Sequence, residues 1–464
     1  MNLLLMITML IIFTVDGKKK NKLIGGKRAP IGMFYSQVSL RWQETHLCAG
    51  TIISTMHILT AASCIIFERN TFASNVEILS GTADQLDAYN PGYLSEVSLL
   101  INHPDYDPRT PWIDDISILK LAKPIVYSRF RLNSDLPYKR HSSNIVFKIS
   151  GWGDTSVDQS NQQSSRYLKY SHAKVLNYDK CIKYLKQLFL YLTNSQSCAC
   201  MTEKNEGILN GDGGGGIIDM DDVYVVDGRK MNKVTGGLRT GIENYPSQVS
   251  LYTARGRLCG GTIVSPAHIL TAANCVVPEL GSTIGNIKIL SGTNDQHDIQ
   301  YADYISEVAY IIYHPKYNPR ATWINDICIL KLTKAIEYSS SRESVELPIF
   351  YHTNSRFKVS GWGTDKAGKK FTRFLHFIDV RVLSSETCRK HLESFSLRMS
   401  SSQSCANGLP PTNWVSNGDG GGGMIYHNTV YGIVSIRIPN KTKTFVFTRV
   451  SYYSDWIRYM MRTY

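Results

Sequence analysis

Short apolar runs separated by turn-forming residues recur along the chain. In these runs apolar and polar residues alternate, or several apolar residues follow one another, and glycine, proline or asparagine stands between the runs. Both patterns are typical of β-strands. Clear cases are Gln37–Leu40, Val76–Leu79, Ile116–Leu119 and Phe147–Ser150. The pattern predicts an all-β fold.

Helical spacing of apolar residues appears in two segments. Apolar residues three or four positions apart occur between Tyr178 and Leu192 and again between Tyr452 and Met461. This period places them on one face of a helix. We therefore expect two short helices, the second of them at the end of the sequence.

Residues 1–15 are almost wholly apolar. The run is too short to span a bilayer, and Val15-Asp16-Gly17 offers the small residues that a signal peptidase reads. It predicts a secretory signal over residues 1–17, and the alternative is a buried N-terminal strand. No later run is long enough for a membrane helix. The protein is therefore expected to be secreted and extracellular, without a transmembrane segment.

The second half of the chain repeats the sequence pattern of the first half, which indicates an internal duplication. Gly25 matches Gly236 at a displacement of 211 residues, and the displacement narrows to 207 residues where Cys181 matches Cys388. This period has the size of a domain, far above the repeat lengths of solenoids and propellers. We expect two tandem domains.

The joint between the two units can be placed near Val226. Residues 226–233 match residues 15–22, so a copy of the leader begins where the first unit stops. The first unit has no counterpart of Val434–Tyr464. The predicted divisions are a signal peptide at 1–17, a short propeptide at 18–22, a truncated first domain at 23–226, a linker at 227–233 and a second domain at 234–464.

Composition changes this picture little. The 464 residues, 43% of them hydrophobic, suffice for two or three domains. The net charge of +13 permits attraction to an anionic glycan or surface, although an ordinary solvated basic surface is the preferred interpretation. No nucleic-acid partner is expected.

Ten cysteines in a secreted chain are expected to pair for the most part. Cys200 and Cys328 are left over once the others are matched. No set of cysteines has the spacing of a structural zinc site, so we expect no metal and no cofactor. Asn440 is a candidate glycosylation site. The four expected disulfides are Cys48–Cys64, Cys181–Cys198, Cys259–Cys275 and Cys388–Cys405.

Four phrases recur in the same order in both units. Leu-Thr-Ala-Ala comes before Ser63 in the first unit and before Asn274 in the second, and a cysteine follows each. Asp115 and Asp326 each begin the phrase Asp-Ile-x-Ile-Leu-Lys-Leu. Ser-Gly-Trp-Gly and Gly-Asp-Gly-Gly-Gly-Gly follow, at residues 150–153 and 211–216 in the first unit and at 360–363 and 418–423 in the second.

Together with two short phrases ending in Gly-Gly, at residues 23–26 and 234–237, this order resembles that of the chymotrypsin-like serine proteases. The resemblance covers nearly all of residues 23–464. It implies that each unit is a double β-barrel with the family's active-site cleft between its barrels. The first unit is expected to lack the C-terminal strands and helix of its second barrel.

The resemblance also assigns the catalytic positions. In the family a histidine takes the proton of the serine nucleophile, and an aspartate orients that histidine. Each unit here keeps the aspartate and lacks both of the other groups, so no catalytic site is expected to be intact. The equivalent positions are Ser63, Asp115 and Gly213 in the first unit and Asn274, Asp326 and Gly420 in the second.

Nearby groups are not expected to restore the chemistry. His57 and His268 stand six residues before the histidine position of the motif, and they are interpreted as ordinary core or surface histidines. Ser63 has no base beside it in the motif. Gly211 and Gly418 can still offer backbone N–H groups at the former oxyanion site.

The resemblance further implies a mode of activation. In the family, cleavage after a basic residue frees an amino group, which pairs with the aspartate that precedes the nucleophile. A buried carboxylate without a cationic partner is costly, which favours the same pairing here. The predicted junctions are Lys22-Leu23 and Lys233-Val234, and the predicted carboxylates are Asp212 and Asp419.

Three functions are compatible with these observations. The favoured one is a secreted, non-catalytic protease homologue that binds a protease, an inhibitor or another component of a proteolytic cascade. The alternatives are a serine endopeptidase with residual activity and a fused or mis-assembled duplicate of a trypsin-like gene.

Overall fold

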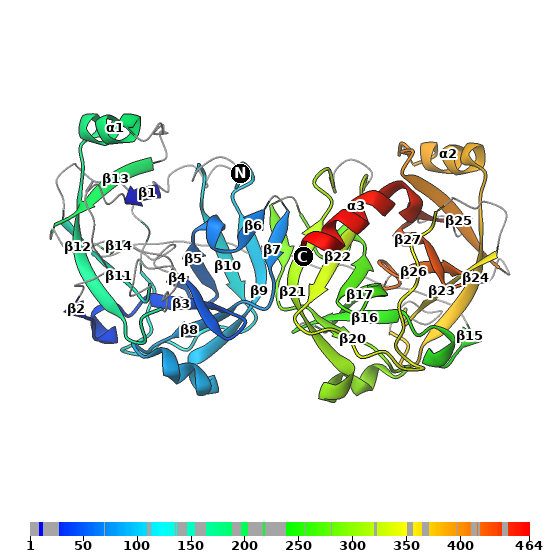
Figure 1. Cartoon of the computed structure of the whole chain (residues 1–464), viewed down its shortest axis with the longest axis horizontal. Coiled ribbons are helices and arrows are strands. Elements are labelled where there is room, and N and C mark those ends of the chain that lie inside the picture. Colours follow the sequence, from blue (N-terminus) through cyan, green and yellow to red (C-terminus); the bar gives the residue numbers. More distant parts are fainter. Residues whose placement is uncertain are drawn as a thin grey trace. The chain divides into compact units, whose positions relative to one another are not determined.

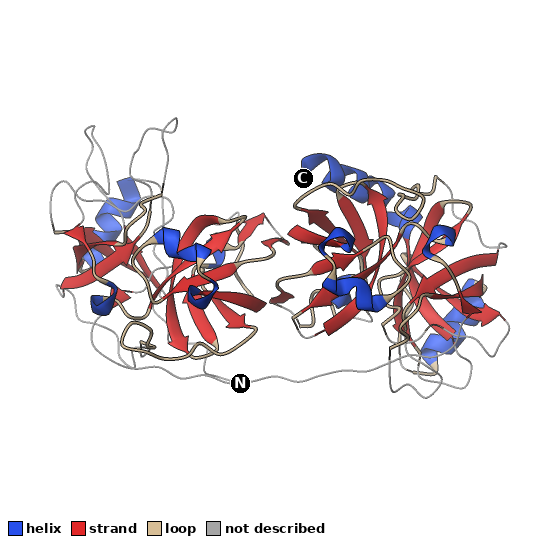
Figure 2. Ribbon diagram, turned by 90° about the horizontal axis from the view of Figure 1, so that it is seen from below, coloured by secondary structure: helices blue, strands red, loops and turns tan. Residues whose placement is uncertain are grey.

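A computed structural model places the chain in two compact units, each described here by itself. The first unit comprises residues 1–69 and 76–227, and the second comprises residues 70–75 and 228–464. Strands dominate both units (Figure 2). The structure describes residues 9–12, 27–68, 70–108, 113–134, 136, 146–153, 164–187, 196–202, 217–218, 238–254, 256–279, 281–319, 323–349, 356–363, 371–395, 397–409, 415, 418–438 and 444–464.

The first sheet of the first unit is a closed barrel of six antiparallel strands, in the order β10-β5-β4-β3-β8-β9 with β9 paired back to β10. Buried and half-buried side chains alternate along β10, as expected for a strand with one face in a core. Its strands are β3 (Gln37–Trp42), β4 (Thr45–Ser54), β5 (His57–Thr60), β8 (Glu77–Ser80), β9 (Leu94–Asn102) and β10 (Ser117–Leu121). A short strand β6 (Ile66–Glu68) also belongs to this unit.

The second sheet of the first unit is not closed in the described residues. Its order is β1-β13-β12-β11-β14, and β2 pairs with β12 beside that path. The strands are β1 (Met9–Ile12), β2 (Lys27–Arg28), β11 (Val146–Gly151), β12 (Lys169–Val175), β13 (Gln196–Met201) and β14 (Ile217–Ile218), with helix α1 (Tyr178–Gln187) before β13.

The second unit contains two closed six-stranded barrels (Figure 1). The first has the order β20-β16-β17-β18-β22-β21 and closes through β20 and β21. Its strands are β16 (Gln248–Thr253), β17 (Gly256–Ser265), β18 (His268–Thr271), β20 (Lys288–Leu290), β21 (Ile305–Tyr313) and β22 (Cys328–Leu332), and the unit also holds β7 (Thr71–Ala73), which pairs with β21, and β19 (Ser282–Ile284).

The second barrel of this unit has the order β24-β23-β26-β27-β28-β25 and closes through β24 and β25. Phe357, Phe445 and Phe447 fill its interior and are fully buried. Its strands are β23 (Arg356–Gly361), β24 (His376–Val382), β25 (Gln403–Leu409), β26 (Gly423–Tyr426), β27 (Thr429–Arg437) and β28 (Thr444–Arg449), and β15 (Leu238–Arg239) pairs with β24.

Two α-helices accompany this barrel. Helix α2 (Ser385–Glu393) begins after Ser384, whose hydroxyl accepts the N–H of Thr387 as an N-cap. Helix α3 (Val450–Thr463) follows β28. Short 3-10 helices occur at Ile31–Met33, Ala62–Cys64, Gln85–Tyr89, Pro91–Tyr93, Ile242–Asn244, Ala273–Cys275, Gln296–Gln300 and Ala302–Tyr304.

The predicted all-β fold of tandem double barrels is confirmed. All four apolar runs given above fall on strands β3, β8, β10 and β11. The predicted terminal helix lies within α3, and the other predicted helix begins at Tyr178 as expected, although residues 188–195 lie outside the described part. Helix α2 was not predicted, because only Cys388 and Leu392 of its residues are buried.

The edge of β13 is paired in an unexpected way. Met9–Ile12 forms the parallel strand β1 along Gln196–Ala199. At the displacement of 207 residues, the matching edge of β25 in the second unit pairs with β28. The first unit has no counterpart of β28, and β1 takes its position. An N-terminal strand was the alternative to the predicted signal peptide, and the signal peptide stays a prediction.

Three of the four predicted disulfides are present, joining Cys48 to Cys64, Cys259 to Cys275 and Cys388 to Cys405. Cys181 is also disulfide-bonded, but the side chain of Cys198 lies outside the described part. Cys200 and Cys328 carry free thiols, and burial raises the pKa of Cys328. No helix in the described ranges has the length and apolar character needed to cross a bilayer.

Candidate functional site

The site of the second unit lies at one end of its first barrel, where β18 ends and the neighbouring strand β22 begins. Asn274 lies in the 3-10 helix that follows β18, and Asp326 lies two residues before β22. The two strands are antiparallel, and Thr271 stands opposite Cys328. This register brings Asn274 and Asp326 together, and the Cys259–Cys275 disulfide holds the 3-10 helix against β17.

The carboxylate of Asp326 accepts hydrogen bonds from two side chains. The backbone N–H of Asn274 donates to Oδ1 at 2.7 Å, and its side-chain Nδ2 donates to Oδ2 at 2.6 Å. The hydroxyl of Ser435, on β27 of the second barrel, also donates to Oδ2. Asn274 Nδ2 makes a further hydrogen bond to the Ser435 carbonyl oxygen at 3.1 Å. The asparagine amide therefore links the aspartate to the second barrel.

Asp326 is fully buried, and its pKa reflects that burial. Loss of hydration raises the pKa of Asp326 to about 6, although the hydrogen bonds from Ser435 and Asn274 oppose the shift. Desolvation disfavours the charged form of a carboxyl group, whereas hydrogen bonds to that form favour it. The network thus keeps an otherwise costly anion partly stabilised inside the unit.

Gly420, which the sequence analysis assigned to the nucleophile position, has room for a side chain. A Cβ atom there would lie 3.8 Å from Cys259 Sγ and 4.0 Å from the Ser435 carbonyl oxygen, which are ordinary contacts. By contrast, Gly421 has a φ of +79°, and a Cβ there would collide with Thr271 Oγ1 and the Gly260 carbonyl oxygen. The loop requires glycine at Gly421 but not at Gly420.

The backbone of this loop keeps two N–H groups without an acceptor. The carbonyl oxygen of Gly420 accepts the N–H of Gly260 at 2.8 Å, and Gly421 N–H donates to the Val434 carbonyl oxygen at 2.8 Å. Among the described residues, neither Gly418 N–H nor Gly420 N–H has a hydrogen-bond acceptor. Two neighbouring N–H groups that lack an acceptor can together stabilise an oxyanion.

Asp419, a predicted activation carboxylate, is buried, and its Oδ1 accepts the N–H of Gly363 at 3.0 Å. Arg257 packs beside it, with its guanidinium over the ring of Phe371 at 5.2 Å. Burial lowers the pKa of Arg257, and the negative charge of Asp419 opposes that shift. Asp419 therefore has a cationic neighbour within the second unit, which the sequence did not indicate.

The first unit repeats the aspartate arrangement with a serine. The backbone N–H of Ser63 donates to Asp115 Oδ1 at 2.6 Å, and its hydroxyl donates to Oδ2 at 2.7 Å. Asp115 is buried, and desolvation raises the pKa of Asp115 against the effect of these hydrogen bonds. Ser63 is exposed and serves as a hydrogen-bond donor to the carboxylate.

His57 and His268 lie away from these sites, as predicted. Each begins its strand, β5 or β18, at the end opposite to the 3-10 helix. Each is buried and pairs through Nδ1 with a serine hydroxyl, at 2.9 Å for His57 and 2.7 Å for His268. Burial lowers the pKa of His268 to about 4. Both are core histidines.

Several predicted site residues lie outside the described part of the chain and stay predictions. The sequence motifs also missed two residues that the structure adds to the site, Ser435 as a donor to Asp326 and Arg257 beside Asp419. Neither lies near its partner in sequence. The predicted residues outside the described part are Lys22, Leu23, Gly211, Asp212, Gly213, Lys233, Val234 and Asn440.

Comparison with known families decides the relationship. The model of the trypsin family matches residues 23–231 and again residues 234–457. The chain belongs to the trypsin family. The two matches together cover most of the sequence, and they confirm two tandem trypsin-like units.

Individual trypsins resemble one unit at a time. Trypsin-4 of Rattus norvegicus is 31% identical over 236 residues, which are 50% of this chain and 90% of that protein. Trypsin zeta of Drosophila melanogaster is 32% identical over 262 residues, 52% of this chain and 88% of that protein. A solved structure of neuropsin, a serine protease expressed in the limbic system of mouse brain, has a TM-score of 0.43 at 23% identity, over 48% of this chain and 98% of that chain.

Proposed function

We propose that the chain is a secreted trypsin-family member without peptidase activity, which acts by binding a protein. The observation that carries the proposal is the contact between Asn274 and Asp326. In a working trypsin-like site, a histidine donates to the aspartate through one ring nitrogen and takes the proton of the serine through the other. The amide of Asn274 makes the first contact and has no basic atom for the second.

The nucleophile position supports the same conclusion. Gly420 has no side-chain atom that can attack a carbonyl carbon, and the sequence places Gly213 at this position in the first unit. Ser63 has a hydroxyl, but that hydroxyl donates to Asp115. Loss of the nucleophile or of the base alone costs on the order of 10⁶ in rate in a convergent protease. Both positions are changed in both units.

The intact surroundings favour a retained binding role over a decaying duplicate. The second unit has two closed barrels and a buried aspartate with hydrogen-bonded oxygens. In its glycine-rich loop, the N–H groups of Gly418 and Gly420 have no acceptor among the described residues. The proposed partner is a protease, an inhibitor or another component of a proteolytic cascade. The disulfides of both units agree with an extracellular location.

A fluorophosphonate probe, which labels reactive serines, tests the absence of peptidase chemistry. The wild-type chain should remain unlabelled. The double variant Asn274→His with Gly420→Ser should become labelled at residue 420, because a Cβ fits there and Asp326 is placed to orient an imidazole. Gly420→Ser alone is the matched control and should label far more slowly.

The outcomes separate the alternatives. Stoichiometric labelling of the wild-type chain would support a residual peptidase and overturn the proposal. Binding is measured separately, by surface plasmon resonance of the immobilised chain against active trypsin and against bovine pancreatic trypsin inhibitor as probes. Saturable binding to either protein supports a binding role. Absence of binding to both would favour a duplicate without a role in this cascade.

A further inference from the structure

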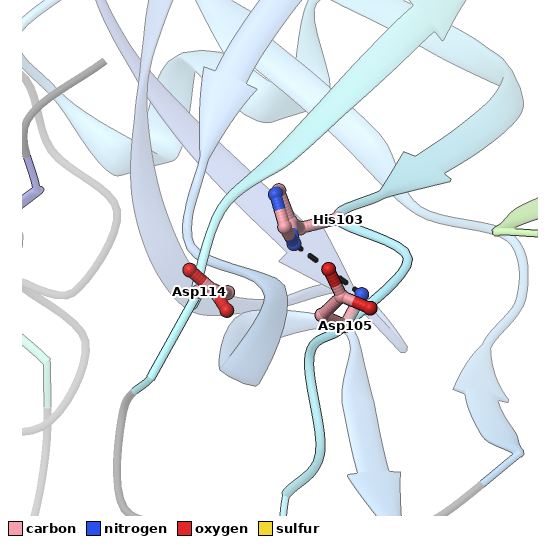
Figure 3. Close-up of side chains that lie close together, drawn as sticks. All are labelled: His103, Asp105 and Asp114. Carbon is pink, nitrogen blue, oxygen red and sulfur yellow. Dashed lines mark hydrogen bonds between the residues drawn. The ribbon is translucent and has the colours of Figure 1, made fainter. Parts of the chain in front are cut away.

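The hairpin loop between β9 and β10 of the first unit brings three potential metal ligands together. His103 follows β9 directly, Asp105 lies two residues later, and Asp114 lies shortly before β10. Figure 3 shows the three side chains close together. One ligand atom from each lies within 4.8 Å of the other two. This loop is separate from the Ser63–Asp115 contact, although Asp114 precedes Asp115.

Backbone hydrogen bonds hold the loop in this form. His103 N–H donates to the Ile116 carbonyl oxygen at 3.0 Å, which extends the β9–β10 pairing by one step. Tyr106 N–H donates to the His103 carbonyl oxygen at 3.2 Å and closes a turn around Asp105. Asp114 has a φ of 54°, a conformation that aspartate tolerates better than most residues. The ligands are thus placed by the ends of the hairpin.

The two carboxylates have no other partner within the described residues. Neither Asp105 nor Asp114 accepts a hydrogen bond or pairs with a cation through its side chain. The imidazole Nδ1 of His103 accepts the backbone N–H of Asp105 at 3.3 Å, which is a long hydrogen bond. Within the described residues, two carboxylates and an imidazole lone pair therefore converge without a cationic side chain paired to them. A bound cation would relieve that repulsion.

The second unit shows the same loop without the two carboxylates. At the displacement of 211 residues the counterparts are His314, Lys316 and Asn325. Asn325 accepts from the Tyr453 hydroxyl at 2.7 Å and donates to the Lys316 carbonyl oxygen at 2.7 Å. The ring of His314 packs on those of Tyr453 and Trp456, at centroid distances of 5.1 and 5.2 Å.

The comparison makes the first unit distinctive. Its sequence has no counterpart of α3, which supplies the rings that cover His314. It also carries carboxylates at the two positions where the second unit has a lysine and an amide. The first unit therefore has a half-buried histidine with two acidic neighbours. The half-buried histidine of the second unit instead packs on two aromatic rings and has a lysine two residues away.

We propose that His103, Asp105 and Asp114 form a binding site for a divalent transition metal of the zinc type. One imidazole and two carboxylates are ligands that Zn²⁺ accepts, and three protein ligands leave a fourth position for water. Calcium and magnesium prefer six or more oxygen ligands or several retained waters, which suits this set less well. The sequence pattern did not reveal the site because it contains no cysteine.

Isothermal titration calorimetry of the full chain with zinc chloride tests the proposal. The wild-type chain should bind zinc with a component that the double variant Asp105→Lys with Asp114→Asn lacks. This variant copies the residues of the second unit, so the loop is expected to tolerate it. Loss of a group that only supports a ligand costs about 10–100-fold in metal affinity, so loss of two ligands should cost at least about 100-fold.

Asp107→Asn is the matched control. It removes a carboxylate from the same loop, and the second unit has Asn318 at that position. Zinc affinity should change by less than about twofold in this control. Near-ultraviolet circular dichroism confirms that each variant is folded. Unchanged zinc binding in the double variant, an equal loss in Asp107→Asn, or preferential binding of calcium chloride would each overturn the proposal.

Discussion

At the scale of single residues, the side chain of Asn274 makes the contact to an aspartate that the proposed function assigns to one of the two tasks of a catalytic histidine. Its amide donates to Asp326 and so satisfies a buried carboxylate, which would otherwise be costly. Ser63 does the same for Asp115 in the first unit. A residue can therefore stabilise the buried aspartate without supporting catalysis, because the aspartate needs a hydrogen-bond donor but not a base.

The pKa of Asp326 gives a test of this network. It should be about 6, well above the value for an exposed aspartate, and Ser435→Ala should raise it further because a donor to the charged form is lost. Carbon-13 NMR of the carboxyl group measures it. Thr448→Val is the control, since Thr448 donates to the backbone oxygen of Asp326 and not to its carboxylate. An unchanged pKa in Ser435→Ala would contradict the assignment.

The sign of the effect on stability follows from the raised pKa. Between about pH 4 and pH 6 the folded chain holds a proton on Asp326 that the unfolded chain has released. Stability is therefore lost as the pH rises through this range, by roughly 3 kcal/mol for this group alone. Above that range its contribution is constant.

Much of the second site could be predicted from sequence, and the reason is local. Asn274, Asp326 and Gly420 each sit inside a short recognisable phrase. Ser435 and Arg257 were missed as partners of the aspartates because those contacts depend on how the two barrels of the unit meet. The cluster of His103 with its two aspartates depends on the shape of one hairpin loop, which the pattern of apolar and polar residues does not describe.

At the scale of elements, the apolar alternation located the strands but not their closure into barrels. The register between β18 and β22 positions the site, and no short-range pattern determines it. Helix α3 has a clearer sequence signal, and its role is also clearer. It follows β28 directly and places Tyr453 and Trp456 against the ring of His314.

Helix α3 should control the protonation of His314. Burial lowers the pKa of His314 to about 4. Trp456→Ala admits water to the ring, so the pKa should rise toward the ordinary value of about 6.5. Proton NMR of the imidazole measures this. Tyr459→Ala is the control, because Tyr459 is an exposed residue of the same helix. A pKa that stays near 4 in Trp456→Ala would show that α3 is not the cover.

The lowered pKa of His314 also determines how the stability of the fold depends on pH. Because the folded-state pKa of His314 lies below its unfolded value, the unfolded chain binds the proton first as the pH falls. Stability attributable to this group is lost between about pH 6.5 and pH 4. Trp456→Ala should narrow that range.

At the scale of the whole molecule, the two units share their sequence motifs, but only the second contains all the strands and helices of the fold. The second unit closes both of its barrels, whereas the second sheet of the first unit stays open in the described residues. The buried side chains of β28 and α3, among them Phe445, Phe447 and Ile457, have no counterparts in the first unit. Each is worth about 1.5–3 kcal/mol when buried, and a domain is stable by only about 5–15 kcal/mol.

The second unit should therefore fold alone, and the first should not. The test is to express two pieces separately, residues 229–464 and residues 18–226. Each piece is heated while its near-ultraviolet circular dichroism is recorded. We expect a cooperative transition from residues 229–464 and a weak or absent one from residues 18–226. Equally sharp and equally late transitions in both would show that the missing segment is dispensable.

A third piece, residues 1–226, serves as the matched comparison, because it restores Met9–Ile12 to the edge of β13. It should melt more cooperatively than residues 18–226 if the strand contributes to that sheet. Identical behaviour of the two pieces would mean that β1 adds nothing to the stability of the first unit.

The pairing of β1 with β13 means that residues 9–12 serve both the predicted export signal and the edge of a sheet in the first unit. If residues 1–17 act as a signal and are removed, Gln196–Ala199 loses its neighbour and becomes an edge of unsatisfied main-chain donors and acceptors. Such an edge accepts an extended peptide from any chain through backbone hydrogen bonds, a mode known as β-augmentation. Removal of residues 1–17 would then leave β13 as an open sheet edge that can bind an extended segment of another protein.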